Sequence, residues 1–147
     1  MNDKHKILAV DDEEPILEIL SFNLEGEGYT VDTSLSAEEA MRKNLPSYDL
    51  FILDVMMGQL SGFRLAEKIR KEMALSTPII FLTARGEKPD IRAGMNLGAD
   101  DYLTKPVARA DLLSAVRRRL ERAAQQARPE FSPNFDSARP LEAVLDL

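Results

Sequence analysis

LFILD (Leu50–Asp54) is an unbroken apolar run that ends in an acid. Two further short runs are mostly apolar: KILAV (Lys6–Val10) and PIIFL (Pro78–Leu82). Short apolar runs bounded by loops are typical of strands that are buried on both faces, as in a parallel sheet. The three runs therefore predict the central strands of one sheet.

Two weaker segments, Tyr29–Thr33 and Tyr102–Thr104, complete the set of strands. The first alternates apolar and polar residues, and the second is short and polar, so we expect both at the edges of the sheet. The helical patterns that separate the strands cover residues 15–25, 36–45, 63–73, 89–98 and 108–126. Pro15 opens the first of them, and a capping box at Ser36 opens the second.

Strict alternation of five strands with five helices predicts an α/β fold, a doubly wound parallel sheet covered by helices on both faces. Right-handed crossovers restrict the strand orders, and the flavodoxin-like order 2-1-3-4-5 fits. We expect one domain over residues 4–126. Residues 127–147 contain several prolines and small polar residues and are predicted to be a linker or tail.

Composition excludes several classes of protein. The net charge of -6 argues against a domain that binds nucleic acid directly, and the absence of cysteine excludes disulfides and cysteine-based zinc sites. No apolar run approaches the roughly 20 residues of a membrane helix, and no signal peptide is visible. A cytoplasmic location with no membrane partner is expected.

Acids follow two of the predicted central strands. Asp11 and Asp12 follow the strand Lys6–Val10, and Asp54 ends the strand Leu50–Asp54. Ligands of doubly wound sheets bind beyond the carboxyl ends of the strands where the winding reverses, here between these two strands. Crowded carboxylates must either take up protons or bind a hard cation such as Mg²⁺.

The remaining strand ends add a hydroxyl and a cation. Thr83 follows the apolar run Pro78–Leu82, the fourth predicted strand, and Lys105 follows the fifth. A carboxylate nucleophile, a metal, a hydroxyl and an ammonium group together suit phosphoryl transfer to an acid.

Four motifs occur in register at these strand ends: ILAVDDE, LDVMM followed by SG, FLTA and GADDYLTKP. Over roughly residues 4–124 the chain resembles a response-regulator receiver domain of bacterial two-component signalling, of the chemotaxis-receiver kind. The resemblance implies a phosphorylation-activated signalling switch. It also implies that the domain is no enzyme, apart from magnesium-dependent phosphorylation and dephosphorylation of itself.

The resemblance assigns roles to individual residues. Asp54 would accept the phosphoryl group. Asp12, Asp54 and the Met56 carbonyl would bind Mg²⁺, and Asp11 would assist through a metal-bound water. Lys105 would pair with the phosphoryl group. In the loop after Asp54, Gly58 stands where receivers often have proline, which leaves the contacts of that loop open.

A conformational switch is also implied. Thr83 would move toward the phosphorylated Asp54, and Tyr102 would turn inward; an ordinary edge-strand aromatic is an equal alternative for Tyr102. The output surface would be the helix 4–strand 5–helix 5 face, which covers roughly residues 89–97, 101–103 and 109–122. The same face would also allow a homodimer. The Lys105-Pro106 bond is expected to be cis.

Partners and output follow from the same resemblance. The phosphoryl donor would be a sensor histidine kinase, a phosphotransfer protein or a small phosphodonor. An effector domain beyond Leu147, with transcriptional output, is slightly favoured over a stand-alone receiver. Three rival functions stay open: a degenerate receiver that only binds proteins, a flavin-binding module and an aspartyl-phosphate phosphatase. The last lacks a general acid, because Met56 stands two residues after Asp54.

Overall fold

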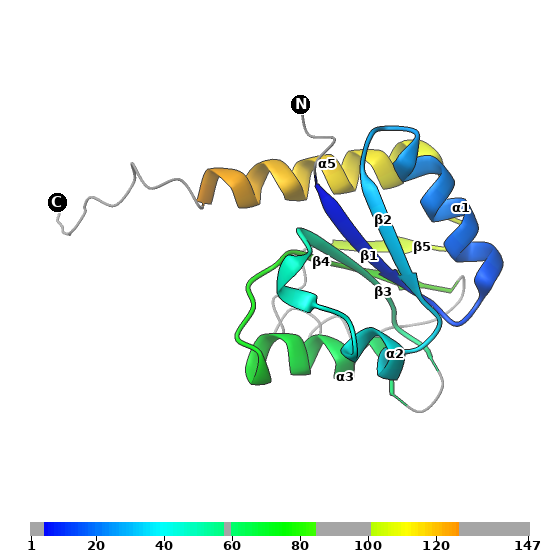
Figure 1. Ribbon diagram of the computed structural model, residues 1–147. Helices are drawn as coiled ribbons and strands as arrows, with labels where there is room; N and C mark the ends of the chain where they lie inside the picture. The colour runs from blue at the N-terminus through cyan, green and yellow to red at the C-terminus, as the bar shows by residue number, and fades with distance from the viewer. Residues whose placement is uncertain (1–4, 58–59, 85–100, 127–147) are drawn as a thin grey trace, which may run out of the picture.

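The sheet has the predicted topology. The computed structural model describes residues 5–57, 60–84 and 101–126, and Figure 1 shows their arrangement. Its parallel strands are β1 (Lys6–Val10), β2 (Thr30–Ser34), β3 (Leu50–Asp54), β4 (Ile79–Thr83) and β5 (Asp101–Thr104). They lie in the order β2-β1-β3-β4-β5, which confirms the flavodoxin-like order. The apolar strands β1, β3 and β4 are central, as expected.

Helices cover both faces of the sheet. The α-helices of the described residues are α1 (Glu14–Glu25), α2 (Ala37–Met41), α3 (Gly62–Glu67) and α5 (Arg109–Gln126). Helices α1 and α5 lie on one face, and α2 and α3 lie on the other (Figure 1). The helix predicted over residues 89–98 falls outside the described part of the chain. No helix within that part is long and apolar enough to cross a membrane.

Alternate residues of each central strand feed two separate cores. One core packs against α2 and α3 and includes Leu8, Val10, Phe51, Leu53 and Phe81. The other packs against α1 and α5 and includes Ile7, Ala9, Ile52, Ile80, Leu82, Leu112, Val116 and Leu120. Because both faces of the central strands β1, β3 and β4 are buried, polar side chains of these strands can reach solvent only from the strand ends.

The helix predicted over residues 36–45 is wrong in its second half. Its start is confirmed, because Ser36 Oγ accepts a hydrogen bond from the Glu39 amide at 3.0 Å. The helix ends at Met41, and a short 3-10 helix, η1 (Leu45–Ser47), follows. Pro46 has no amide hydrogen with which to continue an α-helix, so the chain turns before it.

The helix predicted over residues 63–73 changes its geometry midway. It begins as α3 and continues as a π-helix, η2 (Lys68–Glu72). The Met73 amide donates to the Lys68 carbonyl at 3.0 Å, five residues back. The apolar spacing of the sequence does not distinguish this wider turn from an α-helix, since Ile69 is buried in either case.

Candidate functional site

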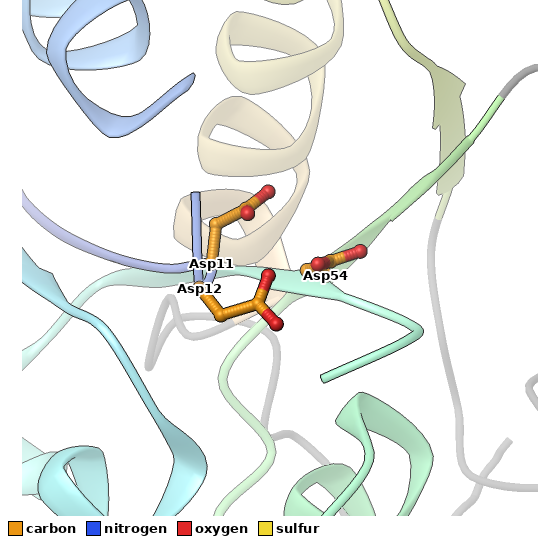
Figure 2. Close-up of side chains that lie close together, drawn as sticks. All are labelled: Asp11, Asp12 and Asp54. Atoms are coloured by element: carbon orange, nitrogen blue, oxygen red, sulfur yellow. The ribbon is translucent and has the colours of Figure 1, made fainter. Parts of the chain in front are cut away.

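Three carboxylates meet at the carboxyl end of the sheet. Asp11 and Asp12 follow β1 directly, and Asp54 is the last residue of the neighbouring strand β3. The two strands pair in parallel, with Val10 opposite Leu53, so their ends coincide. Carboxylate oxygens of the three residues lie within 4.8 Å of one another, and Figure 2 shows the three side chains close together at the two strand ends.

The three acids differ in exposure and in partners. Asp11 is fully buried, Asp54 is 3% exposed, and Asp12 is exposed. Asp11 Oδ1 accepts a hydrogen bond from the Glu13 amide at 2.8 Å, and its Oδ2 lies 2.8 Å from Lys105 Nζ. Asp12 makes no hydrogen bond or ion pair with a described residue. The structure therefore holds Asp11 in place and leaves the oxygens of Asp12 available.

Lys105 joins the site from the end of β5. Its Nζ also lies 3.4 Å from Asp54 Oδ2, and its amide donates to the Thr83 carbonyl at 2.7 Å. Burial opposes the charge on this lysine, but Asp11 and Asp54 outweigh that effect, so the pKa of Lys105 is raised. The Lys105-Pro106 bond is cis, which confirms the prediction.

Asp54 is a buried acid that stays largely ionised at neutral pH. Burial, and then the neighbouring Asp11 carboxylate, raise the pKa of Asp54 to about 6, against the lowering effect of Lys105. The Met56 amide lies 3.4 Å from Asp54 Oδ1, a long hydrogen bond, while the Met56 side chain is 62% exposed. A pKa near 6 leaves Asp54 mostly in its carboxylate form at pH ~7.

Thr83 and Tyr102 come from the two adjoining strands. Thr83 is the buried last residue of β4, one position beyond Leu82, which pairs with Asp54. Tyr102 lies on β5 opposite Phe81, and the two rings are 5.6 Å apart between centroids. Tyr102 is partly buried in the core beneath α2 and α3, an arrangement that both interpretations of this residue allow.

The acid cluster fits a hard divalent cation. It offers carboxylate oxygens from three residues, one of them exposed and uncommitted, and Mg²⁺ prefers oxygen ligands. Lys105 offsets part of the negative charge, yet one ammonium faces three acids. The chemistry of the donor set, together with the raised pKa of Asp54, indicates room for a further positive charge.

Two further residues, Glu13 and Gly62, shape this site, although their residue types predicted no role in it. Glu13 fixes Asp11 through its backbone amide, a contact that no side-chain pattern reveals. Gly62, the first residue of α3, packs so closely that an added Cβ would lie 2.2 Å from the Asp54 carbonyl oxygen. A glycine directly after Ser61, which caps α3 by accepting from the Arg64 amide, was the available signal. Gly58 lies outside the described residues.

Known proteins resemble the chain along most of its length. The family described as the response regulator receiver domain matches residues 7–117. The alkaline phosphatase synthesis transcriptional regulatory protein PhoP of Bacillus subtilis is 44% identical over 119 residues, which cover 80% of this chain and 49% of that protein. The phosphate regulon transcriptional regulatory protein PhoB of Rhizobium meliloti is 43% identical over 122 residues, covering 80% of this chain and 53% of that protein. The chain thus spans about half the length of these curated relatives.

Solved structures agree with the sequence matches. A response regulator receiver domain from Clostridium thermocellum superposes with a TM-score of 0.77 at 35% identity, covering 84% of this chain and 99% of that one. A CheY-like receiver domain protein from Methanospirillum hungatei gives a TM-score of 0.76 at 30% identity, covering 83% and 98%.

Proposed function

The chain belongs to the response regulator receiver domain family, and we propose that it works as a switch in which Asp54 accepts a phosphoryl group. Receiver domains of this family are signalling modules and not enzymes in the usual sense. The observation that carries the proposal is the convergence of Asp11, Asp12, Asp54 and Lys105 at one edge of the sheet. Other receiver domains of this family are parts of two-component response regulators.

The proposed reaction is an in-line transfer to a carboxylate. An Asp54 oxygen attacks phosphorus and forms an acyl phosphate, while the bond from phosphorus to the donor breaks and the donor leaves with that electron pair. The donor is a sensor histidine kinase, a phosphotransfer protein or a small acyl phosphate. Asp54 needs no separate base, because a pKa of about 6 leaves it ionised.

Neighbouring residues position the nucleophile and balance the added charge. Lys105, held by Asp11 at 2.8 Å, lies 3.4 Å from Asp54 and can pair with a phosphoryl oxygen. Asp12, Asp54 and the Met56 carbonyl would hold Mg²⁺, with Asp11 assisting through a water. When bound, the cation supplies positive charge that offsets the charge on the phosphoryl oxygens.

Phosphorylation would be read out on the predicted helix 4–strand 5–helix 5 surface, of which β5 and α5 belong to the described residues and the predicted helix over residues 89–98 does not. In our proposal Thr83 moves toward the new phosphoryl group, Tyr102 turns inward, and the altered surface binds its partner or a second receiver. Within this surface, Asp101 of β5 pairs with Arg118 of α5 at 3.0 Å. The relatives are named transcriptional regulators, so the proposed output is transcriptional and belongs to a domain other than residues 4–126.

Intact-mass spectrometry after incubation with acetyl phosphate and Mg²⁺ tests the proposal. We expect one phosphoryl adduct on the chain, no adduct on the Asp54→Asn variant, and none on the wild type when a chelator removes the metal. The matched control is Asp111→Asn, because Asp111 is an exposed acid in the first turn of α5. An unmodified wild type, or an adduct that survives in Asp54→Asn, would rule out the assignment. The first of these results is also the one expected of a degenerate receiver.

A further inference from the structure

A hollow lies beside the acid site, between α1 and the end of β2. It has a volume of about 420 Å³, which is within the range of binding pockets in proteins. We call it the α1–β2 groove and define it by Glu14, Glu18, Phe22 and Glu25 of α1 and by Ser34 and Leu35 at the end of β2. None of these side chains belongs to the acid cluster.

One wall of the α1–β2 groove is strongly acidic. Glu14, Glu18 and Glu25 lie on one side of α1, four and seven residues apart. Among the residues that the structure describes, no lysine or arginine lines the groove, and no basic side chain forms an ion pair with these three glutamates. Carboxylates gathered without a counter-ion attract a cationic partner.

Apolar side chains stand exposed at the same groove. Phe22 is 77% exposed and Leu35 is 46% exposed, although both are large hydrophobic residues. Leu17, which is buried, also lines the groove. Exposed apolar groups gathered beside charged ones are typical of surfaces that bind other proteins. The combination indicates a partner with an apolar anchor as well as positive charge.

Ser34 adds an independent sign of a missing partner. It lines the groove and is 1% exposed, yet its hydroxyl has no hydrogen-bond partner among the described residues. A buried hydroxyl without a partner is costly, so such groups are usually satisfied. The carbonyl of Ser34 accepts a hydrogen bond from the Asp11 amide at 3.1 Å. The groove and the acid site are therefore joined by one backbone hydrogen bond.

We propose that the α1–β2 groove is a docking site for a basic, apolar-anchored segment of a partner protein. An apolar side chain of the segment packs against Phe22 and Leu35, lysines or arginines pair with the α1 glutamates, and a polar group reaches the Ser34 hydroxyl. The chain's own residues 141–147 have the wrong charge for this role, since they carry Glu142 and Asp146 and no basic residue.

Nuclear magnetic resonance of the full ¹⁵N-labelled chain tests where such a segment binds. The probe is an amphipathic peptide made of leucine and lysine, and the control peptide has glutamate in place of lysine. We expect the lysine peptide to shift the amides of Ser21, Phe22, Ser34 and Leu35 most, and less so as salt rises. Shifts spread over the acidic surface without a maximum here, or centred elsewhere, overturn the proposal.

Charge variants separate the groove from general attraction to an acidic protein. The double variant Glu18→Gln/Glu25→Gln should bind the peptide roughly tenfold more weakly. The double variant Asp111→Asn/Glu121→Gln removes the same charge from exposed positions of α5 and should stay within about twofold of wild type. Equal losses in the two variants would show that only net charge matters.

Apolar and polar variants complete the test. Phe22→Ser should weaken binding roughly tenfold, whereas Ile19→Ser, which alters an exposed residue of α1 outside the groove, should not. Ser34→Ala should leave the stability of the free protein unchanged or higher while weakening binding, because the hydroxyl has a partner only in the complex. Unchanged affinity in both groove variants would contradict the proposal.

Circular dichroism confirms that each variant is folded. Phosphoryl labelling of Asp54 should be normal in all of them, so a failure of the groove proposal is distinct from a failure at the acid site.

Discussion

Replacing Asp54 with asparagine should stabilise the fold in magnesium-free buffer. Burial, and then the neighbouring Asp11 carboxylate, raise the pKa of Asp54 from 3.8 to about 6. An acid whose pKa is higher in the folded than in the unfolded state loses folding free energy when it ionises. This cost is absent below the unfolded-state pKa, grows between the two values and is complete above the folded-state pKa. Asparagine has the same shape and no charge, so the variant avoids the cost.

The size of the effect follows from the pKa shift. A rise from 3.8 to about 6 corresponds to roughly 3 kcal/mol, at about 1.4 kcal/mol for each unit. Relaxation of the site and entry of water reduce this figure, so we expect a gain of ~1–3 kcal/mol at about pH 7.5. At about pH 5 the gain should fall to roughly half, because only part of the titration has then occurred.

Urea unfolding followed by far-ultraviolet circular dichroism measures this gain at both pH values. Glu121→Gln, which removes an exposed acid of α5, is the matched control and should change the stability by less than about 0.5 kcal/mol. Saturating Mg²⁺ should stabilise the wild type more than Asp54→Asn and so narrow the difference. Asp54→Asn could prove no more stable than the wild type near neutral pH, or its gain in stability could be larger at low pH. Either result would show that burial and Asp11 do not destabilise the ionised Asp54.

Two further predictions concern the shape and the charge of the site. Gly62→Ala should cost ~1–3 kcal/mol in urea unfolding, because its Cβ would lie 2.2 Å from the Asp54 carbonyl oxygen; Gly26→Ala, at a helical position with its nearest neighbour 3.3 Å away, should be near neutral. Equal stability of the two variants would contradict the close approach. Lys105→Met should raise the pKa of Asp54 above about 6, because this lysine lowers it. Carbon-13 titration of the Asp54 carboxyl group measures this pKa. An unchanged or lower pKa in the variant would show that the ion pair is unimportant.

Local sequence patterns were sufficient for most of the fold. Apolar runs such as Leu50–Asp54 identified the central strands, because a strand buried on both faces has few alternatives to apolar residues. Alternation with helices then restricted the strand order, which the structure confirms. The helix starts at Pro15 and Ser36 were predicted well. The end of α2 was not, although Pro46 next to the predicted end at residue 45 cannot continue a helix.

The convergence of Asp11, Asp12 and Asp54 could also be predicted, since parallel strands end at a common edge. Their individual states could not. The two neighbours Asp11 and Asp12 have the same side chain, yet one is buried and paired with Lys105 and the other is exposed. Successive side chains on an extended chain point in opposite directions, and only the packed structure shows which direction leads to the lysine.

By itself, then, the sequence determined which segments form strands and which residue types lie at their ends, because both follow from the local pattern of apolar side chains. It restricted the order of the strands in the sheet, which the structure then decided. The tertiary structure alone decided which acid Lys105 pairs with, how closely Gly62 approaches Asp54, and that Ser34, Phe22 and Glu18 line one groove. Those features are distances between atoms of elements that are remote along the chain. Such distances are set by the packing of whole side chains in two cores, a property that no local pattern contains.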